Sequence, residues 1–133
     1  MIINVDFDGV LVPNTHENTL MTKVKNEGLS LDHYNSIWDW YAKVVITPLP
    51  LNIPLLKWLS SLKDNGHTIR LWTNRNTDNI VPTMNNISAW KGLFDSFNFY
   101  SGRKIESRVE GIVIDNSKSN LICGQVGVHY EWK

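Results

Sequence analysis

The stretch IINVDFDG, residues 2–9, decides the fold that this chain is expected to adopt. Its first half is apolar enough for a buried strand, and it ends abruptly at Asp6, Asp8 and the turn-forming Gly9. A short apolar run of this kind is typical of a strand in a parallel sheet, which is covered on both faces. The stretch therefore predicts the first strand of such a sheet, with two carboxylates at its carboxyl end.

Further short apolar runs alternate with helical patterns along the rest of the chain. Strands are predicted over residues 67–72, 97–100, 111–114 and 126–130. Apolar residues at helical spacing predict helices over residues 30–45, 53–64 and 78–90. This alternation predicts a single α/β domain over residues 1–133, with a parallel sheet and helices on both of its faces.

Length and composition agree with one soluble globular domain. The chain has 133 residues, with 13 basic and 13 acidic side chains. The balance argues against a nucleic-acid-coating protein, which needs many phosphate contacts. No apolar run reaches the length of a membrane span, and the first residues lack the features of a signal peptide. The one cysteine, Cys123, cannot form an internal disulfide. We therefore expect a cytoplasmic protein with no membrane partner.

Polar side chains follow three of the predicted strands. Asp6 and Asp8 follow the first, Thr73 follows the strand at 67–72, and Asp115 follows the strand at 111–114. Parallel strands bring their carboxyl ends to one edge, where ligands bind. Two neighbouring carboxylates repel each other, so they favour a hard cation such as Mg2+. One carboxylate can attack phosphorus while the other transfers a proton.

The alternative interpretation of Asp6, Asp8 and Gly9 is a polar turn that merely ends a buried strand.

Four segments of the chain, taken in order, resemble the sequence motifs of the haloacid dehalogenase (HAD) superfamily. They are DFDGV at 6–10, LWTNR at 71–75, Arg103-Lys104, and IVIDN at 112–116. The resemblance spans roughly residues 2–120, which is most of the chain. It implies a Rossmann-like parallel sheet and Mg2+-dependent phosphoryl transfer through an aspartyl phosphate. The second acid, Asp8, favours phosphate esters, because dehalogenases of the superfamily lack it.

The resemblance also implies roles for the two acids of the first motif and for the residues that bind phosphate. Asp6 would be the nucleophile and a metal ligand. Asp8 would be the general acid and base, with its backbone carbonyl on the metal. Thr73 and Asn74 would hydrogen-bond the phosphoryl group, and Lys104 would neutralise the charge on its oxygens.

The fourth motif departs from the usual pattern. Asp115 would hold the metal, but Asn116 stands where many members have a second acid. A neutral amide is a weaker ligand for a hard cation. The Asp-Asn-Ser string resembles the carboxy-terminal-domain phosphatases, so either Asp115 or Asn116 remains a candidate for the direct ligand. Lys118 and Lys91 remain alternatives to Lys104 as the lysine that contacts phosphate.

The chain is too short for a full cap domain over this site. Residues 11–46 are expected to form a flap or a minimal helical lid, and whether the helix at 30–45 covers the site stays open. An open site favours a large phosphorylated substrate, such as a nucleotide or nucleic-acid end or a phosphoprotein, or closure by another subunit. The alternative is a HAD-like binding or regulatory module with little or no catalytic activity.

Overall fold

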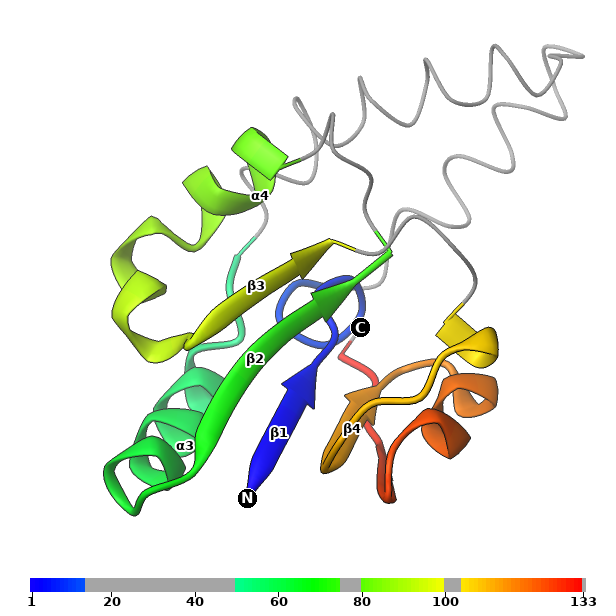
Figure 1. Cartoon of the computed structure of the whole chain (residues 1–133). Helices are drawn as coiled ribbons and strands as arrows, with labels where there is room; N and C mark the ends of the chain where they lie inside the picture. Colours follow the sequence, from blue (N-terminus) through cyan, green and yellow to red (C-terminus); the bar gives the residue numbers. More distant parts are fainter. Residues whose placement is uncertain (14–49, 75–79, 100–103, 133) are drawn as a thin grey trace, which may run out of the picture.

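Five parallel strands form one sheet in the part of the chain that the computed structural model describes. That part is residues 1–13, 50–74, 80–99 and 104–132, and at residues 80–82 only the backbone is described. The sheet has the order β3-β2-β1-β4-β5. Its strands are β1 (Ile2–Val5), β2 (Thr68–Thr73), β3 (Ser96–Phe99), β4 (Ile112–Asp115) and β5 (Val126–His129). Figure 1 shows β1 between β2 and β4, which is the position that its apolar sequence favours.

The order of the strands changes direction at β1. From β1 the chain adds β2 and β3 on one side, and it then returns to add β4 and β5 on the other side. Because the connections leave β1 and β4 in opposite directions, a crevice opens outside the carboxyl ends of these two strands. The topology therefore marks the ends of β1 and β4 as the place where a ligand fits.

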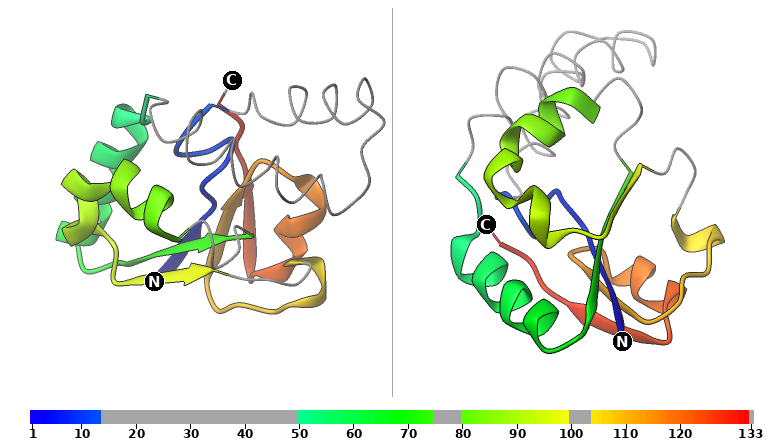
Figure 2. Two further views of the ribbon diagram at one scale, coloured as in Figure 1. Left: turned by 90° about the horizontal axis from the view of Figure 1, so that it is seen from above. Right: turned by 60° about the vertical axis from the view of Figure 1, so that its left-hand side comes forward.

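One face of the sheet is covered by α3 (Ile53–Asp64), α4 (Ile80–Asn86) and the 3-10 helix η3 (Ser88–Leu93), as Figure 2 shows. The side chain of Asn52 caps α3 by accepting from the backbone N–H of Leu55 at 3.2 Å. Leu56 and Leu59 are completely buried on the sheet side of α3. Each contributes about 1.5–3 kcal/mol through the apolar area removed from water. This face therefore holds the larger part of the core.

The opposite face carries the short 3-10 helices η4 (Lys104–Glu106) and η5 (Lys118–Cys123). Trp72, Val113 and Cys123 form a smaller buried cluster there. The connection from β4 to β5 spans only residues 116–125, which is short for an α-helix with its turns. Gly124 lets this connection lie close to β4, since a Cβ at that position would stand 2.7 Å from Cγ2 of Val113. Connections between parallel strands are almost always right-handed. The chain extends the sheet in one direction from β1 and in the other direction from β4, so right-handed connections place the helices of the two halves on opposite faces.

The predicted sheet is confirmed, with each strand starting or ending within about one residue of its expected position. The helix predicted at 53–64 has those bounds. The helix predicted at 78–90 is divided, because α4 ends at Asn86 and η3 begins at Ser88. The described α-helices lie on one face rather than on both, since 3-10 helices take the other. The helix predicted at 30–45 lies outside the described residues, as does all of the predicted lid except residues 11–13.

No helix in the described part of the chain combines the length and the apolar character that crossing a membrane requires.

Gly111 precedes β4 and provides a test of this packing. It has a φ of 91°, and a Cβ added there would overlap the carbonyl oxygen of Ile2. We expect Gly111→Ala to lower the free energy of unfolding by about 2–4 kcal/mol, because it combines left-handed strain with a clash against backbone. Gly92→Ala is the matched control, since a Cβ there meets no atom within 4 Å. Urea unfolding measures both variants, and equal midpoints would contradict the packing described.

Candidate functional site

The carboxyl ends of β1 and β4 bring two acidic side chains together. Asp6 directly follows β1, and its backbone N–H donates to the carbonyl of Ile114 in β4 at 2.9 Å. Asp115 is the last residue of β4. The exposed fraction is 8% for Asp6 and 1% for Asp115. Two carboxylates that are both removed from water need a compensating positive charge.

Lys104 provides that charge from η4. Its Nζ donates to Oδ1 of Asp6 at 2.9 Å, to Oδ2 of Asp115 at 3.0 Å and to the carbonyl of Trp72 at 2.7 Å. The ammonium also lies 4.5 Å from the ring centroid of Trp72. Lys104 is only 2% exposed, and the thiol of Cys123 donates to its backbone carbonyl. An ammonium has three donors, so the protein uses all of them at this point.

Asn116 lies on the other side of the two carboxylates. One terminal atom of its amide is 2.9 Å from Oδ2 of Asp6, 3.2 Å from Oδ1 of Asp115 and 3.2 Å from the backbone carbonyl of Asp8. All three neighbours are acceptors, so the amide nitrogen is the atom that satisfies them. The backbone carbonyl of Asn116 contacts Nε2 of His129 at 3.1 Å. Asn116 therefore marks a point on which three oxygens converge, two from the segment that follows β1 and one from the end of β4.

The electrostatics of the cluster follow from burial and from its charges. Burial raises the pKa of Asp6 to about 7; Lys104 opposes this, while Asp115 and Asp8 add to it. Burial alone would lower the pKa of Lys104, but the attraction of Asp6 and Asp115 outweighs it and the pKa is raised. Lys104 therefore remains charged, while Asp6 takes up a proton more readily than an exposed aspartate does.

The donor atoms of the cluster fit a hard divalent cation. Among the described residues, no group of three or more His, Cys, Asp or Glu side chains is placed to hold a metal ion. The three oxygens around the Asn116 amide are of a different kind, because one of them is the backbone carbonyl of Asp8. The nitrogen of the Asn116 amide faces these oxygens, so the amide would have to turn before its own oxygen could join them as a fourth ligand. An all-oxygen donor set of this composition suits Mg2+ rather than zinc.

The remaining predicted residues are distributed around this cluster. Thr73 ends β2 and is buried, one residue beyond the Trp72 carbonyl that Lys104 binds. Asn74 follows it and is exposed. Of the three candidate lysines, Lys104 contacts both carboxylates, whereas Lys91 and Lys118 are exposed.

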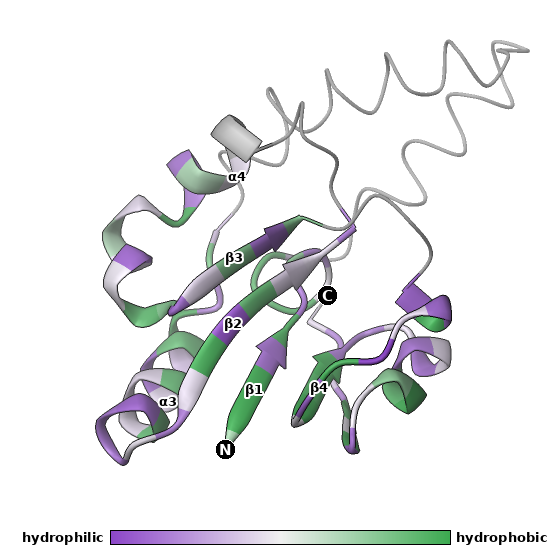
Figure 3. Cartoon of the chain, in the orientation of Figure 1, coloured by the Kyte–Doolittle hydropathy of each residue, from purple (hydrophilic) through white to green (hydrophobic). Residues whose placement is uncertain are grey.

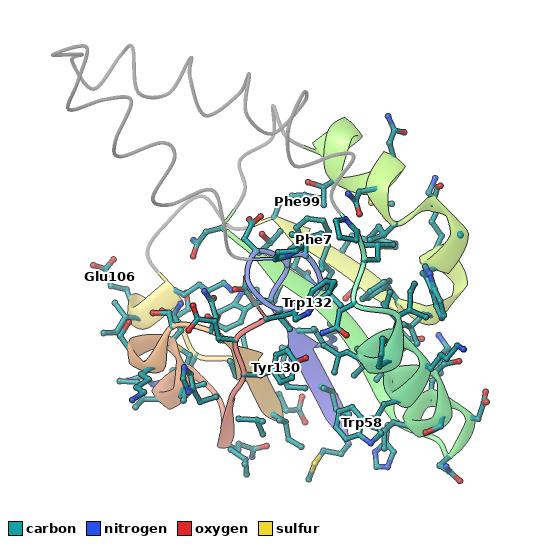
Figure 4. The ribbon with its side chains drawn as sticks, turned by 180° about the vertical axis from the view of Figure 1, so that it is seen from behind. Phe7, Trp58, Phe99, Glu106, Tyr130 and Trp132 are labelled. Atoms are coloured by element: carbon teal, nitrogen blue, oxygen red, sulfur yellow. The ribbon has the colours of Figure 1, made fainter. Side chains whose placement is uncertain are left out.

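No sequence pattern indicated that the segment following β5 contacts the site. The backbone N–H of Tyr130 donates to the carbonyl of Asp115 at 3.1 Å, and that of Trp132 donates to the carbonyl of Gly9 at 2.7 Å. The hydroxyl of Tyr130 accepts from the amide of Asn52 at 2.7 Å. Figure 4 shows Tyr130 and Trp132 on the α3 side of the sheet, near Phe7 in the turn after β1. This segment ties the turn that carries Asp8 to the end of β4, and only tertiary contacts reveal it.

Comparisons with protein-family models and with curated proteins find no match to this chain.

Removal of the buried ammonium tests the balance of charges. We expect Lys104→Met to lower the free energy of unfolding by about 3–5 kcal/mol at pH 8, because two buried carboxylates lose their partner. The loss should be smaller at pH 5. Asp6 has a folded-state pKa of about 7 against an ordinary 3.8, so at pH 5 it is largely protonated in the folded chain. Urea unfolding in EDTA at both pH values measures this difference.

Lys63→Met is the matched control. Lys63 pairs with Asp95 at 3.1 Å, but the side chains are 32% and 41% exposed. An exposed pair contributes about 0–1 kcal/mol, so this variant should lose little at either pH. A loss for Lys104→Met no larger than that for Lys63→Met would contradict the buried charge cluster.

Proposed function

We propose that this protein is a Mg2+-dependent phosphomonoester hydrolase of the HAD type that acts through an aspartyl phosphate. The observation that carries the proposal is the Lys104 ammonium between Asp6 and Asp115 at the carboxyl ends of β1 and β4. These residues come from three of the four segments that resemble the superfamily motifs. They are separated by up to 109 positions in the chain (115 − 6), yet they meet within hydrogen-bonding distance.

The sheet supports a Rossmann-like interpretation of the fold. Its five parallel strands have an order that reverses at β1, and the cluster lies at that reversal. Ligands of open α/β sheets bind at this kind of position. The cluster thus lies at the edge of the sheet where such ligands bind, whereas a purely structural ion pair would be equally stable elsewhere in the core.

The proposed reaction has two steps. A carboxylate oxygen of Asp6 attacks phosphorus, the bond between phosphorus and the ester oxygen breaks, and Asp8 gives its proton to the leaving oxygen. Asp8 then accepts a proton from water as the water oxygen attacks phosphorus, which releases inorganic phosphate and restores Asp6. Asp8 is half-buried, whereas Asp6 is almost fully buried, and partial contact with water suits a group that exchanges protons.

The other residues of the cluster stabilise charge. Lys104 is held beside Asp6, where its ammonium offsets negative charge on the phosphoryl oxygens. Thr73 is the candidate to hydrogen-bond the phosphoryl group from the end of β2. Asp6, the Asp8 carbonyl, Asp115 and Asn116 would hold Mg2+, which neutralises charge on the transferring group when bound. A phosphorylated substrate follows from this chemistry, and nucleotide or nucleic-acid ends and phosphoproteins all carry the required ester.

One observation favours the alternative of a binding module without turnover. All three donors of Lys104 are engaged within the protein, so a phosphoryl group would have to share or displace one of them. An inactive chain would keep the cluster as a structural ion pair and use the same crevice to bind a partner. The two functions differ in turnover, which is directly measurable.

Phosphate release from an aryl phosphate tests catalysis. We expect hydrolysis by the wild-type protein with Mg2+, background release in EDTA, and background release for Asp6→Asn because the nucleophile is absent. Asp8→Asn should lose about 10²–10⁴-fold, which is the usual contribution of a general acid and base. The control is Asp64→Asn, which changes an exposed acid at the end of α3. Equal activity in wild type and Asp6→Asn would exclude the proposed mechanism.

Mg2+ binding measured by calorimetry separates the two functions further. Because Asp6 has a pKa of about 7 without metal, protons compete with Mg2+, and the affinity should be about tenfold weaker at pH 6 than at pH 8. Asp115→Asn should weaken binding at both pH values, and Asp64→Asn should leave it unchanged. Binding that is independent of pH would mean that Asp6 is not a ligand.

A further inference from the structure

The turn after β1 is held to the rest of the fold through three consecutive carbonyl groups. The carbonyl of Gly9 accepts from the backbone N–H of Trp132 at 2.7 Å, and that of Leu11 accepts from the backbone N–H of Asn52 at 2.8 Å. The carbonyl of Val10, between them, accepts from Nδ2 of Asn52 at 3.2 Å. Asn52 therefore donates to two of these three carbonyls, once from its backbone and once from its side chain.

The carbonyls of the turn depend on such donors because the turn is apolar. Val10, Leu11 and Val12 are completely buried, and Figure 3 shows the loop after β1 largely in the green of hydrophobic residues. A buried carbonyl has little access to water, and leaving it unpaired is costly. The N–H groups of the turn are used within it, by the carbonyls of Phe7 and Val12. The donors therefore have to come from elsewhere in the fold.

Asn52 is itself fixed in place by its remaining hydrogen bonds. It is 3% exposed, and its Oδ1 caps α3 by accepting from the backbone N–H of Leu55 at 3.2 Å. Its Nδ2 donates to the hydroxyl of Tyr130 at 2.7 Å as well as to the carbonyl of Val10. An amide has two N–H donors, so both are used. The side chain therefore connects the start of α3 and the segment after β5 to the turn.

The position of Asp8 depends on this turn. The next residue, Gly9, is the first of the attached residues and has a φ of 82°, a conformation that side-chain-bearing residues rarely adopt. A shift of the turn would move the carboxyl group of Asp8 with it. A general acid has to lie within hydrogen-bonding distance of the oxygen that it protonates. A displacement of about 1 Å is enough to lower a rate about 100-fold.

We propose that Asn52 is a positioning residue for proton transfer by Asp8. It acts through the turn after β1, and it lies outside the four segments that resemble the HAD motifs. The proposal rests on the proposed phosphomonoester hydrolase function, in which Asp8 gives its proton to the leaving oxygen.

The leaving group of the substrate distinguishes this role from a general loss of structure. Phenyl phosphate releases a phenol with a pKa of about 10, like that of tyrosine, so its departure needs the proton from Asp8. 2,4-Dinitrophenyl phosphate releases a much more acidic phenol, which leaves without a proton. The value of kcat/KM covers the steps up to cleavage of the ester bond. Its ratio for the two substrates therefore measures the contribution of the proton.

Steady-state hydrolysis of both substrates in saturating Mg2+ tests the proposal. We expect Asn52→Ser to lower kcat/KM about tenfold or more for phenyl phosphate and less than about twofold for 2,4-dinitrophenyl phosphate. Serine still caps α3 but is too short to reach the carbonyl of Val10. Tyr130→Phe removes only one acceptor of the amide, so a smaller loss of about two- to threefold is expected, with the same dependence on the leaving group.

Asn65→Ser is the matched control. It makes the same change at the exposed C-terminal end of α3, and it should behave like wild type with both substrates. Asp8→Asn is the reference, because it removes the acid itself and should show the same leaving-group dependence to a greater extent. Urea unfolding curves check that every variant is folded in the assay. If Asn52→Ser does not fold, Tyr130→Phe decides the result.

Two kinds of failure are distinguishable. A wild-type protein that hydrolyses neither substrate, or an Asp8→Asn variant that loses both equally, would refute the proposed chemistry and the role of Asn52 with it. If Asp8→Asn shows the leaving-group dependence but the folded Asn52→Ser and Tyr130→Phe variants do not, the proposed hydrolase stands and Asn52 is only a helix cap.

Discussion

The burial of one positive and two negative charges at a single point constrains the rest of this structure. Asp6, Asp115 and Lys104 are almost completely removed from water, and each is costly to bury alone. They can be buried together only if the ends of β1 and β4 are adjacent and η4 returns over them. The parallel register, the close approach at Gly111 and the packing of Cys123 on Lys104 all serve that geometry.

The same constraint connects stability with the proposed chemistry. A carboxylate whose pKa is raised to about 7 destabilises the folded chain when it ionises without a partner, and a bound cation relieves that cost. Lys104 relieves part of it, and in the proposed function a cation held by the three oxygens around Asn116 would relieve more. Stored electrostatic strain of this kind is common where a protein has to bind charge.

The described elements cover the two faces of the sheet to different extents. The α3 face holds most of the buried apolar side chains and is closed by helices. The opposite face is closed over β4 and β5 by η5 but is left as a pocket beside β2 and β3. This division follows from the short connection between β4 and β5, which is sufficient for a 3-10 helix over two strands; no other described helix lies over the rest of that face.

The sequence by itself determined the five strands, the helix at 53–64 and the residue types at the carboxyl ends of β1, β2 and β4. Apolar runs and their acidic endings predict the strands, because the period and the length of such runs depend only on local chemistry. The resemblance to the HAD motifs predicts that Asp6, Lys104 and Asp115 belong to one site, with Lys104 directed at phosphate. Only the tertiary structure decided that Lys104 rather than Lys91 or Lys118 lies beside the carboxylates, and that the amide of Asn116 faces three oxygens. It also decided that Tyr130 and Trp132 hold the turn after β1, and that Asn52 donates to two carbonyls of that turn. These are contacts between residues far apart in the chain, and no local pattern encodes a distance across the sheet.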